Sequence, residues 1–365
     1  MNGDQMKISV AILSVLTAAA LGATEVPSEA FAKIPANPGF AFARSLDAHS
    51  RSTGEASPIP GAYCMAKYPV TNGEYRAFCD ATGHRPPRYW KNGAYPAGKE
   101  KHPVLFVSVE DAEAYCDWYG KSHPGWKFRL PTEAEWENAA AGPRKTEFPW
   151  GDRAGAELRD GVMQSRFNFN GVAAAYFLKQ DPDRIVTFIH PKSPRKGEKV
   201  KLSEVISFAG RGGVRGWIDH RDYAGFVYTD LFRSLSDEGG FTTPVDRYPD
   251  GASPYGVFDL AGNSWDWTCS GIVASNGAER NQVVNAIRGG SWYANANSCR
   301  TNYRGEGRRG RGGYNTVGFR LVAVPAGAPD VNLAGQKTPP RDSGSTGPGP
   351  RRGGPPHRRK GPPKP

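Results

Sequence analysis

Three segments of the chain place apolar side chains at the three- and four-residue spacing of an amphipathic helix. Thr71 with Glu74, and Thr132 with Glu135, form capping boxes at the start of two segments, and Ser108 can cap the other. A glycine follows the stripe in each case and can end the helix. The expected buried stripes are Tyr75, Phe78, Cys79 and Thr82; Ala112, Tyr115, Cys116 and Tyr119; and Trp136, Ala139 and Ala140.

Short runs of β-branched and aromatic residues surround these helices and predict strands. The runs start at Tyr63, Pro103, Val283 and Val317. Residues 148–254 are Gly-rich and weakly periodic, which is typical of long loops that bind a ligand or need an ion to hold them. Within them, we interpret residues 172–236 as an insertion with strands in RIVTFIHP and GFVYTDLF.

The N-terminus has the composition of a leader that directs export. From Met6 it carries one lysine, an apolar run over residues 8–20, and AFA at 30–32 in the small-x-small pattern of a signal-peptidase site. The run is too short to anchor the chain in a membrane. We therefore predict a signal peptide over 1–32, no transmembrane anchor, and a periplasmic or extracellular protein. A buried N-terminal helix is the alternative.

The remaining chain divides by composition into a linker over 33–58, a folded domain over 59–325 and a Pro/Gly/Arg-rich tail over 326–365. The net charge is +11, and from residue 336 onward eight Lys or Arg face one Asp. With few apolar side chains, the tail is predicted to be disordered. In an exported protein a basic tail favours an acidic surface or polysaccharide as partner over nucleic acid, and a solubilising extension is the alternative.

Five cysteines, at positions 64, 79, 116, 269 and 299, permit two disulfides and leave one thiol over. Cys79 and Cys116 lie on expected buried stripes, where small core residues are the default interpretation. The sequence contains no G-x-S-x-G elbow, phosphate-binding P-loop or H-E-x-x-H zinc motif. These absences argue against the hydrolase, nucleotide-binding and zinc-protease classes that use those motifs.

Several strings occur together in the order found in one family. They are KYPVTNGEYRAFCDATGH, HPVLFVSVEDAEAYCDWYG, RLPTEAEWENAA, FPWGD, YGVFDLAGNSWDW and RGGSW…CR…GFRLV. The chain resembles the formylglycine-generating enzyme family, also called the sulfatase-modifying factor family, from about residue 59 to 324. The resemblance implies an α+β fold, a loop-rich variant of the C-type lectin-like fold with few helices. The strands on either side of the last irregular segment are expected to be framework.

Two calcium sites are implied by the resemblance. In DLAGNSWD, carboxylates and backbone carbonyls can form the oxygen cage that Ca²⁺ accepts, whereas spacing alone would suggest a turn with Asx hydrogen bonds. The first site would use Asp259, Gly262, Ser264 and Asp266. The second would use the Asn168 side chain, the Phe169 carbonyl, the Asp237 side chain and the Gly239 carbonyl.

The family's oxidases bind copper(I) through two cysteines, five residues apart, in the loop after GGS. Cys299 matches the second position, and Ala294 stands at the first. Two thiolates suit copper(I) and one cannot build the same site, so the copper site is incomplete. Cys269 could supply the missing sulfur, or could form a structural disulfide with Cys299.

We expect a pocket whose catalytic residues are Cys299, Ser291 and Trp265, with Arg300, Tyr293 and Asn295 as substrate contacts. The leading hypothesis is an oxidative maturation or tailoring factor acting on a peptide or small molecule. The alternative is a non-catalytic ligand-binding module that uses the 293–316 loop. That loop is rich in Tyr and Asn, resembles the binding surface of retroelement-diversified lectin-like proteins, and has the residue types that binding loops favour.

Overall fold

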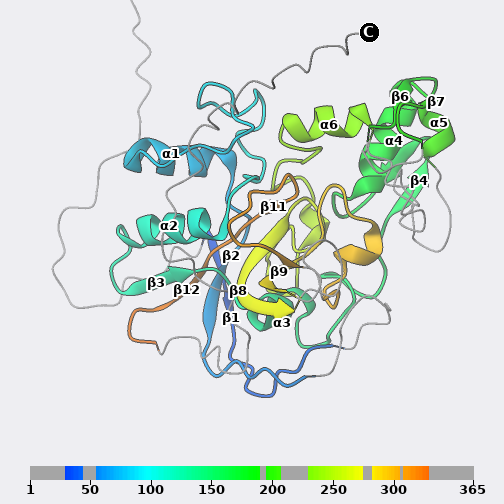
Figure 1. Ribbon diagram of the computed structural model, residues 1–365. Helices are drawn as coiled ribbons and strands as arrows, with labels where there is room; N and C mark the ends of the chain where they lie inside the picture. The colour runs from blue at the N-terminus through cyan, green and yellow to red at the C-terminus, as the bar shows by residue number, and fades with distance from the viewer. Residues whose placement is uncertain are drawn as a thin grey trace, which may run out of the picture.

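The computed structural model describes residues 29–43, 55–189, 195–206, 229–273, 282–304 and 307–328. The first 28 residues and the basic tail from 329 onward lie outside these ranges, and with them most of the predicted signal peptide. None of the helices in the described ranges is long and apolar enough to cross a membrane. Two four-stranded sheets form the centre of the molecule, with helices packed around them (Figure 1).

The first sheet joins the two ends of the described chain. Its strand order is β1-β2-β12-β3, and every neighbouring pair is antiparallel. Phe31 and Ala32 belong to β1 and are buried, although the sequence placed them in the leader. Cleavage after residue 32 would therefore remove half of β1. The strands are β1 (Phe31–Ile34), β2 (Tyr63–Ala66), β3 (Trp126–Arg129) and β12 (Val322–Pro325).

The second sheet frames the irregular segment that follows Arg288. Its order is β10-β9-β8-β11, with β11 parallel to β8 and the other pairs antiparallel. The segment leaves the sheet at the end of β9, rejoins it briefly at β10 and again at β11, so the flanking runs are framework strands, as expected. The strands are β8 (Trp265–Val273), β9 (Val283–Arg288), β10 (Gly307–Arg308) and β11 (Val317–Gly318).

The three expected helices are confirmed as α1 (Asn72–Thr82), α2 (Val109–Gly120) and α3 (Glu133–Ala141). Thr71, Ser108 and Thr132 each accept a hydrogen bond from the backbone N–H three residues later, and all three helices begin with a capping box. Gly83 ends α1 in the left-handed conformation that a glycine adopts without steric cost.

The strand predicted from Pro103 is wrong. Residues 103–107 follow an irregular path, and Phe106 has a φ of 59°. Val104, Leu105 and Val107 are buried all the same, and the run makes only an isolated antiparallel bridge, between Pro103 and Thr71. A run of four apolar residues reports burial, and only the neighbouring backbone decides whether a ladder forms.

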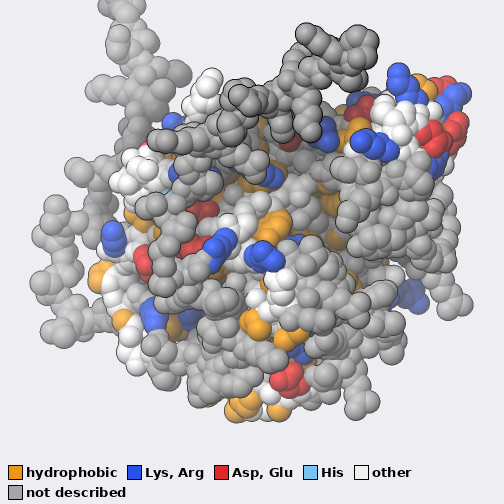
Figure 2. All heavy atoms as spheres, in the orientation of Figure 1, with side chains coloured by type: hydrophobic (Ala, Val, Ile, Leu, Met, Phe, Trp, Pro, Cys, Tyr) orange, Lys and Arg blue, Asp and Glu red, His pale blue; other side chains and the backbone are white. Residues whose placement is uncertain are grey.

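The predicted insertion contains short elements that gather on one side of the molecule, with β6, β7 and α5 at the upper right of Figure 1. RIVTFIHP supplies β6, as predicted; part of GFVYTDLF lies outside the described residues, and its end begins α6. Figure 2 shows charged side chains of both signs on this corner. The insertion range takes in most of α4 (Asn170–Gln180), then β6 (Ile185–Thr187), β7 (Lys199–Lys201), α5 (Leu202–Val205) and most of α6 (Asp230–Asp237). Outside it lie β4 (Glu157–Arg159), β5 (Val162–Gln164) and the short 3₁₀ turns η1 (Pro249–Gly251) and η2 (Ala296–Cys299).

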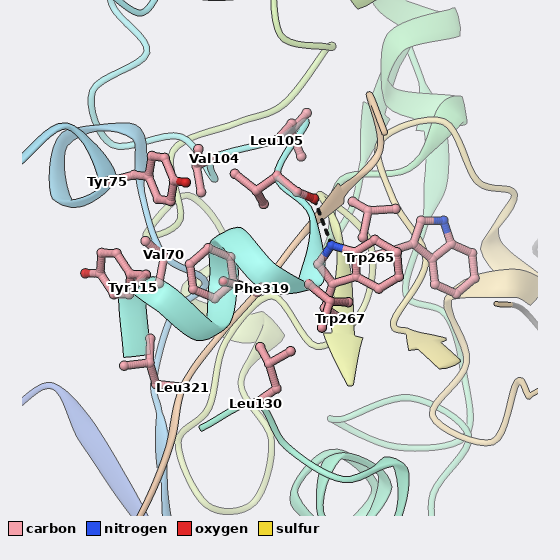
Figure 3. Close-up of a cluster of buried hydrophobic side chains, with 14 of the residues drawn as sticks. Val70, Tyr75, Val104, Leu105, Tyr115, Leu130, Trp265, Trp267, Phe319 and Leu321 are labelled. Carbon is pink, nitrogen blue, oxygen red and sulfur yellow. Dashed lines mark hydrogen bonds between the residues drawn. The ribbon is translucent and has the colours of Figure 1, made fainter. Parts of the chain in front are cut away.

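Aromatic side chains from α1, α2 and the second sheet form the largest core cluster (Figure 3). Tyr75 and Tyr115 stack with ring centroids 6.0 Å apart, and Phe319 meets both edge-on. Trp267 donates from its indole to the Val107 carbonyl at 2.9 Å, which satisfies the polar end of a fully buried ring. This cluster holds the helices against the sheet from which the irregular segment departs.

Helix α3 is buried on all sides and carries glutamates into the interior. Arg288, at the end of β9, pairs with Glu133 at 2.9 Å and with Glu137 at 2.6 Å. Arg304 pairs with Glu133 at 2.8 Å and lies over the Phe42 ring. Opposite charges and hydrogen bonds offset the cost of desolvating these groups. Because Arg288 and Arg304 stand before and within the irregular segment, the network connects α3 to that segment at two points.

Candidate functional site

The irregular segment begins with a tight turn at Gly289 and Gly290. Gly290 has a φ of 78°, and a Cβ added there would lie 2.3 Å from Cys299 Sγ. Only glycine therefore lets the strand end pack this closely on the thiol. Asn295 caps the following 3₁₀ turn by accepting from the Ser298 N–H at 3.0 Å. These local bonds fix the position of Cys299.

Cys299 lies in the interior. Its exposed fraction is 0%, and its neighbours include the aromatic rings of Phe148, Phe167 and Phe169. Burial raises the pKa of the thiol well above its usual range. The Sγ atom lies 3.4 Å from the Asn295 carbonyl oxygen, to which the thiol donates. A thiol in this setting is a core residue with little thiolate character.

The five cysteines are all free. Cys269, on β8, packs against the large aromatic cluster, whereas Cys299 belongs to a different cluster. The Cys269–Cys299 disulfide is therefore absent, and the structure gives no support to a sulfur supplied by Cys269. Cys79 and Cys116 are buried on α1 and α2, as the helical pattern indicated.

The residues expected around a pocket are mostly interior as well. Trp265 and Ser291 are buried, and the Ser291 hydroxyl accepts from the Tyr293 N–H at 3.3 Å. Arg300 is half-buried and lies 3.4 Å from Glu147. The Tyr293 ring packs on Phe232 with centroids 4.1 Å apart. The structure thus places the expected catalytic set in packed surroundings instead of around an opening.

The loop proposed as an Asn- and Tyr-rich binding surface also turns inward. Asn302 and Tyr303 are buried, and Asn315 donates to the Ser236 hydroxyl at 2.7 Å. The Tyr314 ring meets Trp267 with centroids 6.0 Å apart. These contacts hold the loop against the body of the protein, whereas Tyr293, Asn295, Tyr314 and Asn315 are half-buried and Asn297 is exposed.

Asp259 and Asp266 flank a turn in which three residues have positive φ: Asp259 (52°), Asn263 (61°) and Gly262 (79°). Asp266 Oδ2 accepts from Trp136 Nε1 at 2.8 Å and from Arg320 Nε at 2.6 Å. Arg320 also donates to the Asp259 carbonyl at 3.0 Å. The buried guanidinium therefore joins both ends of the turn.

The same turn keeps polar atoms without partners. Asp266 Oδ1 and Ser264 Oγ are buried and have no hydrogen-bond partner among the described residues. Burial raises the pKa of Asp266, and burial raises that of Asp259 to about 7. Two buried carboxyl groups facing one guanidinium leave negative charge in excess whenever both are ionised. The donor set is chemically suited to a hard cation.

A cleft of about 520 Å³ opens beside the cluster that holds Cys299. It lies between β5, α4 and the segment 241–250, and Met163 and Val172 belong both to its lining and to the Cys299 cluster. Other lining residues are Arg166, Tyr176, Lys179, Phe241, Arg247 and Tyr248. None of these residues belongs to the sites expected from the sequence.

A sequence profile described as the sulfatase-modifying factor enzyme 1-like domain matches residues 36–180 and 206–324, more than half of the chain. The chain belongs to the formylglycine-generating enzyme family. The expected α+β fold of the sulfatase-modifying factor type is confirmed. The profile leaves 181–205 unmatched, a shorter segment than the insertion predicted over 172–236.

Relatives in the family carry different activities in their names. The chain is 28% identical over 255 residues to the inactive C-alpha-formylglycine-generating enzyme 2 of Bos taurus, covering 67% of this chain and 59% of that protein. It is 25% identical over 304 residues to the formylglycine-generating enzyme of Mycobacterium tuberculosis, covering 74% of each. Over 123 residues, 26% of each chain, it is 33% identical to hercynine oxygenase of Mycolicibacterium thermoresistibile. The chain thus spans about 59% of the length of the bovine relative.

Two solved structures resemble this one in outline. PvdO from Pseudomonas aeruginosa has a TM-score of 0.48 at 18% identity, covering 80% of this chain and 93% of that chain. Treponema denticola variable protein 1 has a TM-score of 0.44 at 18% identity, covering 81% and 95%.

The two-cysteine copper site of the formylglycine-generating enzyme family does not fit the residues present. Ala294 offers a methyl group, and its backbone is held by bonds to Ser291 and Asn170. Cys299 offers a single thiol whose pKa is raised by burial. The family's copper(I) site uses two thiolates, and this loop supplies only one sulfur.

The second calcium set implied by the family is not brought together as a complete set, although Asn168 Oδ1 is buried and has no hydrogen-bond partner among the described residues. Asn168 binds Phe241 and Asn263 through its amide nitrogen, whereas Asp237 is exposed at the end of α6. The Gly239 carbonyl accepts from Lys99 Nζ at 3.4 Å. Lys99 Nζ therefore already occupies this carbonyl in the structure. Phe169 begins α4 without a side-chain cap.

Sequence reasoning missed the residues that depend on contacts across the chain. Glu133 and Glu137 had no visible partner, because Arg288 lies about 150 positions away on β9. Arg166 and Arg247 come from separate segments that meet only at the cleft. The one signal available was the concentration of aromatic and basic residues in the weakly periodic stretch 148–254.

Proposed function

We propose that this chain is a ligand-binding member of the formylglycine-generating enzyme family that does not make formylglycine by two-cysteine copper chemistry. The observation that carries the proposal is the pair of positions 294 and 299. The first is alanine, and the second is a thiol with no exposed surface. The name of the bovine relative, an inactive enzyme, is consistent with a family scaffold used without this chemistry.

The competing hypothesis of an oxidative tailoring factor requires a reactive group that meets its substrate. Of the residues expected to be catalytic, Cys299, Ser291 and Trp265 are all buried. Arg300 is half-buried and paired with Glu147. The cleft that a ligand can enter is lined by Met163 and Val172, which also pack in the Cys299 cluster, and none of the expected catalytic residues lines it. Binding therefore needs no rearrangement of the core, whereas oxidation at Cys299 does.

Calcium at the turn from Asp259 to Asp266 is part of this proposal. The carboxylates of these two residues would hold the ion together with carbonyl oxygens of the turn. Carbonyl oxygens would be needed, since no group of three His, Cys, Asp or Glu side chains comes together within the described ranges. Calcium would supply positive charge to a buried, partly unpaired carboxylate pair. Its contribution would be structural, since it would fix the start of β8.

Export and the basic tail complete the proposal. A leader before β1 would deliver the domain to the periplasm or the exterior, and the tail would attach it to an acidic surface or polysaccharide. Fusing residues 1–40 to a reporter that is active only outside the cytoplasm tests the first expectation. A reporter that stays inactive would contradict export.

Copper binding and thiol reactivity test the central claim. The purified protein, its Cys299→Ser variant and the matched Cys64→Ser variant, whose buried thiol lies on β2, are titrated with copper(I) against a chromophoric chelator. We expect the same copper retention in all three proteins. Cys299 should react with a thiol reagent only after unfolding in urea.

A further variant, Ala294→Cys, tests whether the missing sulfur is what prevents copper(I) binding. In Ala294→Cys, the family's pair of sulfur positions is restored, and we expect copper(I) retention to rise relative to the parent chain. Retention of one copper per parent chain that disappears in Cys299→Ser but persists in Cys64→Ser would overturn the proposal.

A further inference from the structure

The cleft beside α4 is built from three segments that are distant in sequence. One wall is β5 with its neighbours up to Arg166, the second is the face of α4 that carries Tyr176, and the third is the segment 241–250. Its volume of about 520 Å³ lies in the range typical of small-molecule sites. Every lining residue belongs to the described part of the chain.

The charge of the lining is predominantly positive. Arg166, Lys179 and Arg247 face a single lining carboxylate, that of Asp250. None of the three cations forms an ion pair with a carboxylate of the described residues, and Lys179 makes only a long contact, 3.4 Å, to the Asp160 carbonyl. Unpaired cations around a concave surface attract anions and hold them by charge-assisted hydrogen bonds.

Aromatic surface accompanies the charge. Tyr176 is 49% exposed although it is a large aromatic residue on a helix. Its ring lies 5.3 Å from that of Phe241, and the half-buried Tyr248 completes this part of the lining. Leu158 and Val162, on the adjacent β4–β5 hairpin, are also exposed. A ligand that only needed charge would not require this apolar surface.

We propose that this cleft binds an organic anion that carries an aromatic ring, with the anionic group at Arg166 and Arg247 and the ring against Tyr176. The ligand class is a small aryl carboxylate, sulfate or sulfonate. The inference rests on the proposed function in one respect, since the ligand is bound without chemical change and the buried Cys299 thiol is not part of the cleft lining.

The fluorescent anion 1-anilinonaphthalene-8-sulfonate is a suitable probe, and the neutral N-phenyl-1-naphthylamine is its uncharged counterpart. Both are titrated into the full chain at low salt and in 1 M NaCl. We expect saturable, one-site binding of the sulfonate that weakens in high salt, because screening acts on the charge contacts. The neutral compound should bind more weakly and without salt dependence.

Variants locate the site. We expect Arg247→Gln and Arg166→Gln each to weaken sulfonate binding about fivefold, as for a partly exposed ion pair. Tyr176→Ala should weaken both probes. Arg159→Gln is the matched control, because Arg159 is an exposed arginine on neighbouring β4, is paired with Glu157 and does not line the cleft. It should change binding by less than about twofold.

Two results would overturn the inference. One is equal affinity for the charged and neutral probes, and the other is equal affinity in the two cleft-arginine variants and the Arg159 control. Circular dichroism and thermal melting of each variant show that loss of binding is not loss of folding. Failure here leaves the copper titration unaffected, so the inference and the proposed function fail by different measurements.

Discussion

Arg288 Nη1 lies 2.9 Å from Glu133 Oε1, and both side chains are buried. The pair joins α3 to the end of β9, immediately before the turn that leads to Cys299. Arginines at 288 and 304 hold the ionised form of Glu133, and its pKa is lowered despite burial. The position of the loop therefore depends on a charge pair inside the core.

We predict that Glu133→Gln lowers the free energy of unfolding by about 3–5 kcal/mol, because two buried guanidinium groups lose their shared carboxylate. Urea unfolding at pH 7 measures the change. Glu157→Gln is the control, since it breaks only an exposed pair with Arg159 and should leave the free energy of unfolding close to that of the parent chain. Similar losses in both variants would show that the buried network has no special role.

The close contact between Gly290 and Cys299 can be tested with a single and a double variant whose effects on stability should not add. Gly290→Ala places a Cβ against Cys299 Sγ at a φ of 78°, and we expect a loss of about 2–4 kcal/mol from strain and overlap. Adding Cys299→Ala should recover part of this loss, because the overlapping sulfur is removed. Gly83→Ala, at a φ of 72° with no atom within 4 Å, isolates the backbone cost of about 1 kcal/mol. Additive losses in the double variant would contradict the contact.

Calcium should stabilise the fold through the turn from Asp259 to Asp266. At a calcium concentration of about 100 Kd, mass action adds about 2.7 kcal/mol, which raises the Tm of a domain this size by several degrees. Differential scanning fluorimetry with calcium and with a chelator measures the shift. Asp259→Asn should abolish most of it, whereas Asp250→Asn, at an exposed residue, should not. An identical Tm with ion and chelator would exclude the site.

His102 should make stability depend on pH. Burial, and then the nearby Lys99 ammonium, lower the His102 pKa to about 4. Between this value and the unfolded value of about 6.5, the unfolded chain binds more protons, so stability falls as the pH falls through this window. The difference between the two pKa values corresponds to about 3 kcal/mol in the free energy of unfolding for a fully buried group. At this half-buried position we expect about half of that.

The measurement is urea unfolding between pH 4 and 7. His102→Gln should flatten the slope in this window, because the imidazole that the folded state keeps neutral is gone. His123→Gln, at the end of α2, serves as the histidine control. Parallel slopes for the parent chain and the His102 variant would show that other groups set the pH dependence.

Much of the helical structure could be predicted because its determinants are local. Thr71 and Glu74 are three residues apart and fix the start of α1 whatever surrounds them. The strand predicted from Pro103 had no such determinant, since a ladder needs a neighbouring backbone that the sequence does not specify. The same apolar residues became a buried irregular segment. The local sequence pattern was enough to predict that these residues are buried. Their backbone conformation depends on the segments packed around them.

The family and the missing copper ligand follow from the sequence by itself, because a motif and the alanine at position 294 are written in the chain. Whether Cys299 meets solvent, which carboxylates Arg288 and Arg320 satisfy, and where a cleft opens were decided by the tertiary structure. Each depends on groups brought together from distant segments, as Asp266 and Arg320 are across 54 positions. Burial, pKa and cavity shape are properties of such assemblies, and they arise only when the chain has closed around its core.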